Sequence, residues 1–568
     1  MQATTGTYQD AVALYTRRRY GEALALLEAQ EPEPDADFAT QALRLNLMGA
    51  CLVGLGRHDE AKLAIRQALA LAPGLADAHY QHGNALQGLA QAQQAIEAYR
   101  QALALDSAHL AAGLQLALAY TRLEHLPQAA QAYRQVLARR PDLAEVHNNL
   151  GTVLERMGQR IEAEAAYRQA ATLRPDYAEA NRNLASTLAH LGRLAEAESF
   201  FRRVVALRPD SIDALDRLAK VLSERNALPE AEDLYRRILG ARPDSASAHE
   251  KLGSVLHRQD RFAEAARAYR DALAIDSSDG DAWSNLGAVL DHLDRLEEAE
   301  AAFRRALEII PDFPDASFGL SLVLLRQGKL EEAWPLYEAR YDPRRELRWT
   351  HRSVPKLECP QWRGESLAGK SLVVWQDQGH GDMVQFGRYL ALLKARGVSR
   401  LTLVCLPTLA PLFARMPAVD AVVARGKDAT LEDARALAGH DYWTFVMSLP
   451  LRFGAAPGSI APAVYLRPDP ERAGIWHERL AALPGRKIGL VWKGNARHSN
   501  DHNRSLPSLR ALAPLWNIPN ASFVSLQKGQ AEDEALAVPH DQPLLHLGSE
   551  IRDFADSAAL IAQLDFVI

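Results

Sequence analysis

Four polar side chains in the C-terminal third of the chain have the types and positions needed to move a proton and to hold a diphosphate. Asp382 ends the segment QDQGHGD, which follows the short apolar run SLVVW. A carboxylate at such a place can act as a general base toward a hydroxyl group. Lys493, Arg504 and Ser505 follow a second apolar run, RKIGLVW. Cationic side chains and free N–H groups there can hold a departing diphosphate.

Each of these residues also has a purely structural explanation. Asp382 falls in the first turn of an expected helix, where the helix dipole favours a carboxylate. Gly379 and Gly381 either let an acceptor approach the backbone or give a tight turn a positive φ. Lys493 and Arg504 belong to a loop rich in Asn, His, Arg and Lys, which is ordinary surface composition. The sequence leaves both interpretations open.

Alternating strands and helices must position these side chains. The first series of predicted elements comprises strands at 371–375, 401–406, 418–424 and 442–448 and helices at 383–397, 408–415 and 430–438. The second series comprises strands at 486–492, 521–527 and 544–548, a final strand in LDFVI, and helices near 508–515 and 530–536. Arg504 and Ser505 are expected where the helix near 508–515 begins. Such alternation predicts doubly wound parallel sheets, which bind ligands at the carboxyl ends of their strands.

A period of 34 residues organises the chain before this region, with eight consecutive blocks over 42–313. Position 20 of every block is alanine, and position 32 is proline in six blocks. Position 8 is always small: Gly49, Gly83, Ala117, Gly151, Ala185, Ala219, Gly253 and Gly287. Position 24 is aromatic in seven blocks: Tyr99, Tyr133, Tyr167, Phe201, Tyr235, Tyr269 and Phe303. Small residues let two helices approach, the aromatic ring fills the groove between them, and proline ends the second helix.

The pattern resembles the tetratricopeptide repeat, with irregular capping units at 5–37 and 314–341. Such repeats bury their apolar faces only against neighbours and form a solenoid with a long groove, which binds peptides. Position 6, which faces the groove in this family, carries amides that Arg217 and Lys251 interrupt: Gln81, Gln115, Asn149, Asn183 and Asn285. The amides either clamp an extended peptide backbone, as an asparagine ladder does in protein O-GlcNAc transferases, or are ordinary polar side chains facing solvent.

The C-terminal region carries a closer resemblance. QWRGESLAGKSLVVWQDQGHGDMVQFGRYL, IGLVWKGNARHSNDHNRSLP, FVSLQKG and DFADSAALIAQLDFVI are together similar to bacterial proteins that fuse tetratricopeptide repeats to a heptosyltransferase-like glycosyltransferase domain. The resemblance implies an α-solenoid followed by an α/β region of GT-B type, with two Rossmann-like lobes. In that family the last strand continues into an Asp-Thr segment and a His, so the second lobe is expected to be truncated here and the chain to be inactive alone.

The resemblance also implies a domain order and a chemistry. The expected parts are a solenoid at 1–341, a linker at 342–369, a first, acceptor-side lobe at 370–468 and a second, nucleotide-sugar-side lobe at 485–568, joined by the linker DPERAGIWHERLAALPG. The implied reaction is inverting transfer from a nucleotide-sugar to a protein or peptide acceptor. Asp382 matches the Gly-Asp that supplies the base, and Arg504 with Lys493 would hold the diphosphate. No Asp-x-Asp occurs in this region, so neither a metal nor another cofactor is expected. The competing hypothesis is a non-catalytic scaffold whose repeats bind protein.

Composition excludes several other classes of protein. Apolar residues make up 48% and charged residues 24% of the 568, which is globular composition. The net charge is -6 and no long basic block occurs, which argues against nucleic acid or anionic membranes as partners. Cys51, Cys359 and Cys405 lie far apart, which favours a reducing compartment. Without a signal peptide or an apolar stretch of spanning length, we expect a cytoplasmic location.

Overall fold

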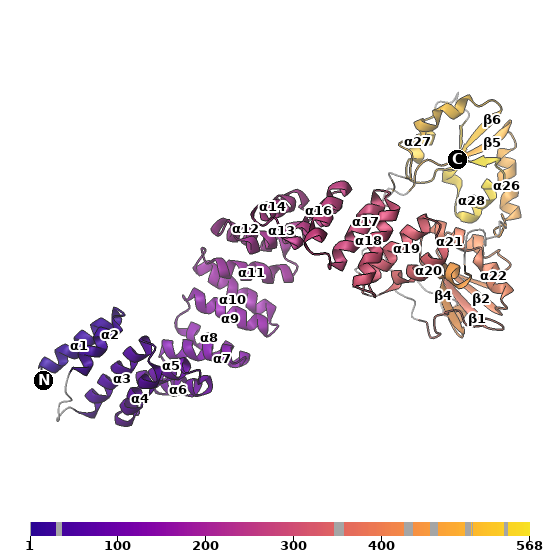
Figure 1. Ribbon diagram of the computed structural model, residues 1–568. Helices are drawn as coiled ribbons and strands as arrows, with labels where there is room; N and C mark the ends of the chain where they lie inside the picture. Colours follow the sequence, from indigo (N-terminus) through magenta and orange to yellow (C-terminus); the bar gives the residue numbers. More distant parts are fainter. Residues whose placement is uncertain are drawn as a thin grey trace. The chain divides into compact units, whose positions relative to one another are not determined.

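The computed structural model describes residues 2–29, 37–342, 344–345, 357–424, 435–454, 464–494, 501, 504–538 and 544–568. The chain divides into two compact units, residues 1–277 and 278–568. The described part of the first unit is helical, whereas the second unit contains both helices and two parallel sheets (Figure 1). The predicted solenoid end at residue 341 falls inside the second unit and stays a prediction as a domain boundary.

In the first unit, each helix packs on the next one along the chain (Figure 1). The helices are α1 (Gln2–Thr16), α2 (Tyr20–Glu28), α3 (Phe38–Gly54), α4 (His58–Leu71), α5 (Ala76–Gly88), α6 (Ala92–Leu105), α7 (Leu110–Arg122), α8 (Leu126–Arg139), α9 (Ala144–Arg156), α10 (Arg160–Leu173), α11 (Ala178–His190), α12 (Leu194–Leu207), α13 (Ile212–Glu224), α14 (Leu228–Ala241), α15 (Ala246–Arg258) and α16 (Phe262–Ile275). Two helices fall in each 34-residue block, as the repeat predicts.

Small and aromatic residues bring the two helices of a repeat together. A Cβ atom on Gly151 in α9 would lie 2.6 Å from Cε1 of Tyr167 in α10, and one on Gly253 would lie 2.9 Å from Cδ1 of Tyr269. The ring therefore occupies the space that a larger residue at position 8 would need. Tyr167 is 1% exposed, and its hydroxyl donates to Oγ1 of Thr152 at 3.2 Å, so its polar end is satisfied. The predicted role of positions 8 and 24 is confirmed.

Proline ends the second helix of a repeat, and the next helix binds the proline carbonyl. α4 stops at Leu71, two residues before Pro73. The carbonyl oxygen of Pro73 lies 3.0 Å from Nε2 of His79, which is position 4 of the following block. The same contact recurs at 2.9 Å for His147 on Pro141 and at 3.0 Å for His249 on Pro243. Position 4 thereby helps to fix each repeat to the next.

Ion pairs join the second helices of consecutive repeats. Arginine at position 25 pairs with glutamate at position 19 of the next block, as in Arg134 with Glu162 at 2.7 Å and Arg168 with Glu196 at 3.1 Å. A second row pairs glutamate at position 21 with a cation in the next repeat, as in Glu232 with Arg261 at 2.7 Å. The exposed pairs are individually weak, but their repetition fixes the register of neighbours.

The second unit begins with two more helix pairs: α17 (Gly280–His292), α18 (Leu296–Ile309), α19 (Pro314–Arg326) and α20 (Leu330–Tyr337), followed by η1 (Glu338–Tyr341). Glu300 in α18 accepts hydrogen bonds from Nζ of Lys329 and Nη2 of Arg304, each at 2.7 Å. Burial alone would raise the pKa of Glu300, but these cations and Gln327 lower it to about 2. The second row of ion pairs therefore continues into this unit.

Glu300→Gln is expected to lower the free energy of unfolding by about 2 kcal/mol at pH 7, because it removes a carboxylate from two cations. The pKa of Glu300 is depressed in the folded state, so its contribution is present above its ordinary pKa, near 4.5, and is lost as pH falls toward about 2. Urea unfolding of both proteins between pH 7 and pH 3 measures this. Glu308→Gln, at an exposed pair with Arg305, is the control. A difference that stays constant with pH would contradict the prediction.

The first lobe, residues 357–454, contains a parallel sheet with the strand order β3-β2-β1-β4. Its strands are β1 (Ser371–Trp375), β2 (Arg400–Cys405), β3 (Ala421–Ala424) and β4 (Tyr442–Phe445). Val373 pairs with Thr402 on one side and with Trp443 on the other. The helices are α21 (His380–Phe386), α22 (Tyr389–Ala395), α23 (Ala410–Phe413), η2 (Val446–Ser448) and α25 (Leu449–Arg452). The predicted parallel alternation is confirmed here.

Two predictions for this lobe need correction. The single helix expected at 383–397 is two short helices that separate at Gly387, where Phe413 of α23 comes close to the backbone. The linker expected at 342–369 partly belongs to the lobe. N of Trp362 donates to O of Trp443 at 2.7 Å, and the Trp362 side chain is 1% exposed in the core. Most of the helix expected near 430–438 lies outside the described residues.

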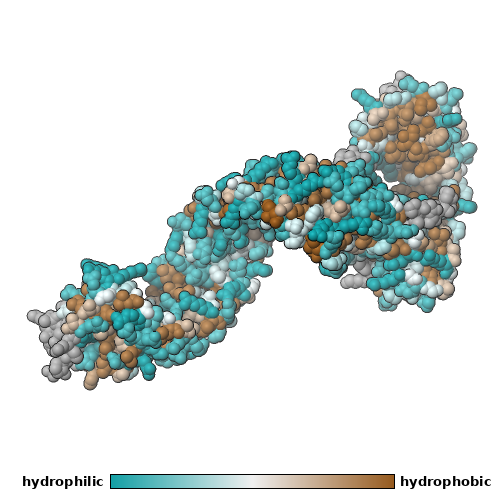
Figure 2. Space-filling model, in the orientation of Figure 1, coloured by the Kyte–Doolittle hydropathy of each residue, from teal (hydrophilic) through white to brown (hydrophobic). Residues whose placement is uncertain are grey.

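The second lobe, residues 464–568, repeats this topology with the order β7-β6-β5-β8, all parallel. Its elements are α26 (Pro470–Leu480), β5 (Arg486–Leu490), η4 (Leu509–Asn517), β6 (Ala521–Ser525), α27 (Glu532–Leu536), β7 (Leu544–His546), η5 (Gly548–Glu550), α28 (Phe554–Ile561) and β8 (Phe566–Val567). In Figure 2, hydrophobic residues gather on this lobe. Its exposed apolar side chains include Val491, Phe566 and Ile568.

The segment expected to link the lobes is the helix α26, and this prediction is wrong. Trp476 and Leu480 are buried in the core of the second lobe with Val524 and Leu560. The sequence did carry a helix signal, Asp469 followed by proline, because the Asp469 carboxylate caps the helix by accepting from N of Glu471 at 2.9 Å. None of the helices in the described part of the chain has the length and apolar character to cross a membrane.

A buried network ties η1 to the first lobe. Arg340 is 1% exposed, and its guanidinium lies 4.2 Å from the ring centre of Tyr337 and 3.9 Å from that of Tyr341. It pairs with Glu338 at 2.8 Å and with Asp377 at 3.5 Å. Asp377 lies two residues after the end of β1, so this network fixes the last repeat to the turn that carries Asp382.

Candidate functional site

The turn after β1 holds Asp382 in a structural role. Oδ2 of Asp382 accepts from N of Gly379 at 3.0 Å, which is the N3-to-N-cap half of a capping box at the start of α21. The carboxylate is half-buried at the carboxyl end of a central strand, where open α/β sheets bind ligands. The helix-cap explanation is therefore realised, and the role as a base stays a prediction.

The two glycines of this turn do not have the positive φ that one explanation required. Gly379 has φ -67°, and neither Gly379 nor Gly381 is among the residues with positive φ. A Cβ on Gly381 would meet no atom within 4 Å, so the space above this backbone is open. The positive-φ explanation is wrong, whereas close approach of a ligand to the backbone stays a prediction.

Two buried glutamines that the sequence analysis missed shape the loops after the strands. Gln376, 1% exposed, donates from Nε2 to O of Gln378 and O of Gly379 at 3.0 Å and accepts from N of Leu406 at 2.8 Å. Gln527 does the same in the second lobe, because its Oε1 accepts from N of Lys493 at 3.0 Å. The signal for both was an amide within two residues of the end of an apolar strand.

Lys493, Arg504 and Ser505 lie in the loop after β5. The Lys493 backbone is bound by Gln527, and its side chain is half-buried. Arg504 is exposed. Ser505 does not begin a helix as expected, since η4 starts at Leu509. Its hydroxyl instead donates to Oδ1 of Asp501 at 2.7 Å and accepts from N of Gly494 at 2.8 Å, which closes the loop.

The structure does not bring the predicted catalytic set into contact. Among the described residues, Asp382 makes no hydrogen bond or ion pair with Lys493 or Arg504. The lobes meet instead where the ring of His380 stacks on Phe554, with ring centres 5.1 Å apart. Nε2 of His380 lies 2.9 Å from Oγ1 of Thr408, whose carbonyl accepts from N of Phe554 at 3.0 Å.

Some of the amides at position 6 contact neighbouring side chains, as Gln81 does with Asn84 and Asn183 does with Asn148. None of them is exposed: Gln81 is buried, and the others are half-buried, namely Gln115, Asn149, Asn183 and Asn285. Nδ2 of Asn183 donates to Oδ1 of Asn148 in the preceding repeat at 3.0 Å, and Lys251 reaches Asp216 in the same way at 2.7 Å. Asn183 thus contacts the preceding repeat, and both explanations of these amides, as clamps for a peptide backbone and as ordinary polar side chains, stay predictions.

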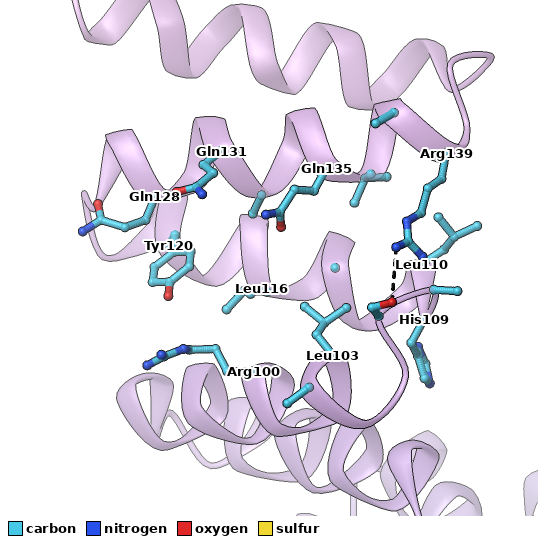
Figure 3. Close-up of a pocket in the computed structure, with 17 residues that line it drawn as sticks. Arg100, Leu103, His109, Leu110, Leu116, Tyr120, Gln128, Gln131, Gln135 and Arg139 are labelled. Atoms are coloured by element: carbon cyan, nitrogen blue, oxygen red, sulfur yellow. Dashed lines mark hydrogen bonds between the residues drawn. The ribbon is translucent and has the colours of Figure 1, made fainter.

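An open cavity of about 880 Å³ lies between α6 and α8, over α7 (Figure 3). Leu103 and Leu116 give it an apolar floor, and Gln128, Gln131 and Gln135 line it from α8. Arg100 and Arg139 lie toward its opposite ends in Figure 3. All seventeen lining residues are described, and none of them is acidic.

A second hollow on the repeats has a different charge pattern from the cavity over α7. It has a volume of about 470 Å³ and is lined from the repeats at 212–245 and 246–279. Its lining mixes Asp213 and Asp216 with Arg242 and Lys251, and Lys251 is already paired with Asp216. Only the cavity over α7 therefore has, of these two, an excess of positive charge.

Comparisons with known families identify the repeats. Family models described as tetratricopeptide repeat match residues 44–74, 76–109, 117–158, 148–212, 217–280 and 280–313. Protein FlbA of Caulobacter vibrioides is 32% identical over 260 residues, which cover 41% of this chain and 41% of that protein. The chain thus spans about two fifths of the length of this curated relative.

Solved structures of repeat proteins are also similar. PilF of Pseudomonas aeruginosa is 19% identical, covering 38% of this chain and 97% of its own, with a TM-score of 0.32. MamA from Desulfovibrio magneticus is 23% identical, covering 30% and 95%, with a TM-score of 0.29. The C-terminal part of a repeat protein from Cytophaga hutchinsonii is 16% identical, covering 49% and 99%, with a TM-score of 0.34.

Proposed function

We propose that this protein is an interaction scaffold whose tetratricopeptide repeats bind a polypeptide partner. The repeats before the α/β region match that family and supply most of the chain's helices. The observation that carries the proposal is the open cavity over α7. It has an apolar floor, and the side-chain amides of α8 line it. Polypeptides use both features, since side chains bury on apolar surface and backbone groups bind amides.

Binding of peptides from a random seven-residue library to the full chain, measured by fluorescence anisotropy, tests the proposal. Asn149→Ala combined with Asn183→Ala is expected to weaken the tightest binders about tenfold, because position 6 faces the peptide groove in the tetratricopeptide family. Gln169→Ala, an exposed amide on the second helix of the same repeat, is the control and should change nothing. Absence of any binder, or equal loss in the control, would contradict the proposal.

Glycosyl transfer is the second candidate, supported by the α/β region. Two parallel sheets have the same strand order, and loops carrying Asp382 and Lys493 follow the central strands β1 and β5. In this proposal Asp382 takes the acceptor's proton, and Lys493 with Arg504 holds the nucleotide diphosphate of the sugar donor. A protein acceptor would bind the repeats.

Calorimetric titration with ADP, UDP and GDP examines this candidate directly. One nucleotide is expected to bind, with affinity reduced about tenfold by Lys493→Ala or Arg504→Ala, because each removes a cation from the diphosphate. Arg510→Ala, an exposed cation on η4, is the control. Asp382→Asn should keep nucleotide binding, because Asp382 is proposed to contact the acceptor and not the diphosphate. If none of the three nucleotides binds, the α/β region is not a nucleotide-sugar site and the scaffold function stands alone.

A further inference from the structure

We propose that the cavity between α6 and α8 binds an acidic peptide segment, whose carboxylates are held by Arg100 and Arg139. This inference rests on the proposed scaffold function and names the chemistry of one partner. It follows from three departures from the repeat pattern that all fall at the same junction, between the blocks 76–109 and 110–143.

The first departure is a gap in the row of ion pairs between repeats. Arg134 and Arg168 pair with Glu162 and Glu196, each 28 residues later. Arg100 occupies the same position in its repeat, but the residue 28 later is the neutral Gln128. The ion pair that the structure gives Arg100 is with Glu97 of its own helix, at 3.3 Å, and both side chains are more than half exposed. Its guanidinium is thus available to a carboxylate from a partner.

The second and third departures open the space. Position 4 is Gly113, whereas His79, His147 and His249 fill this position in other repeats and reach a proline carbonyl. The proline itself is replaced by Ser107. Gly113 is one of the residues that line the cavity, so no side chain at position 4 takes up space there.

The lining fits an acidic, partly apolar peptide in an extended conformation. Gln128, Gln131 and Gln135 follow one face of α8 toward Arg139 (Figure 3). The eleven steps from Gln128 to Arg139 span about 16 Å of helix, the length of about five extended residues. Arg139 donates to the neutral Oγ of Ser107 at 3.4 Å, so its charge is not compensated there. Apolar side chains would contact the floor, amides the peptide backbone, and arginines the carboxylates.

Fluorescence anisotropy with two designed peptides tests the inference on the full chain. One seven-residue peptide carries glutamates near both ends and leucines between them, and its twin has glutamine in place of each glutamate. The acidic peptide is expected to bind at least about tenfold more tightly, with the preference reduced by salt. Arg100→Gln combined with Arg139→Gln should abolish the preference. Arg168→Gln, at the equivalent position but paired with Glu196 and Glu164, is the matched control and should retain it.

Gln128→Glu separates binding from folding. It introduces the glutamate that six of the eight repeats carry at this position and should pair with Arg100. Acidic-peptide binding is therefore expected to fall about tenfold, while the midpoint of thermal unfolding is unchanged or higher. Equal binding of the two peptides, an acid preference that survives the double arginine substitution, or equally good displacement by polyphosphate would overturn the inference. If other library peptides still bound and responded to Asn149→Ala with Asn183→Ala, the scaffold function would remain supported.

Discussion

Arg340→Ala is expected to destabilise the second unit by about 3–5 kcal/mol, the cost of leaving a buried charge without its partner. Asp377 is 5% exposed, and Arg340 is the cation beside it, at 3.5 Å. The Tyr341 hydroxyl also donates to this carboxylate. The pKa of Asp377 is already raised, because the effect of burial exceeds the lowering by Arg340 and Tyr341. Loss of the guanidinium therefore removes the largest interaction that stabilises the buried, charged carboxylate.

Tryptophan fluorescence measures this effect selectively, because all nine tryptophans follow residue 277 and so belong to the second unit. When the full chain is unfolded with urea, the tryptophan signal of Arg340→Ala should change at a lower urea concentration than that of the unchanged protein. Arg344→Ala is the control, since Arg344 makes exposed pairs with Asp312 and Asp342 and its loss should leave the urea midpoint nearly unchanged. Equal effects of the two substitutions would contradict the buried network.

The loss in free energy of unfolding caused by Arg340→Ala should also depend on pH. Without the cation, the folded-state pKa of Asp377 rises further above its ordinary value. A carboxyl group with a raised folded-state pKa stabilises the fold below its unfolded-state pKa, and this contribution is lost as pH rises through the folded-state value. The deficit is therefore largest at neutral pH and shrinks toward about pH 4. Adding Asp377→Asn to Arg340→Ala should recover part of the loss at pH 7.

Tyr167→Ala is expected to cost the first unit about 3–5 kcal/mol, the usual loss for truncating a fully buried aromatic side chain. The ring fills the space beside Gly151 and is 1% exposed. Tyr167→Phe should cost only about 1 kcal/mol, because it keeps the ring and loses the hydroxyl contacts to Thr152 and Glu155. Circular dichroism at the helix band reports these changes, since the first unit contains no tryptophan.

Gly151→Leu supplies the complementary test of the same contact. Alone it should destabilise by about 1–3 kcal/mol, because its Cβ would lie 2.6 Å from Tyr167. Combined with Tyr167→Ala, the leucine should fill part of the space that the ring leaves, so the double variant should be less destabilised than the sum of the two. Strict additivity would show that the two positions do not share one packing space.

The sequence by itself determined the repeats, because their information is local and recurs. A 34-residue period placed the helix pairs over 42–313, and the pairing of small position 8 with aromatic position 24 specified how each pair packs. Alternating apolar runs likewise placed most strands of both parallel sheets. Each of these features depends on residues a few tens of positions apart, which periodicity and propensity can reveal.

Only the tertiary structure decided what the polar side chains do. Asp382 became a helix cap, Ser505 a loop closure, and Asn183 a contact between repeats, because the acceptors and donors around them come from backbone geometry. The salt bridge between Arg340 and Asp377 joins elements whose proximity no local pattern encodes. Hydrogen bonds and buried charges depend on distances of a few ångströms, and those distances are set by packing of the whole unit.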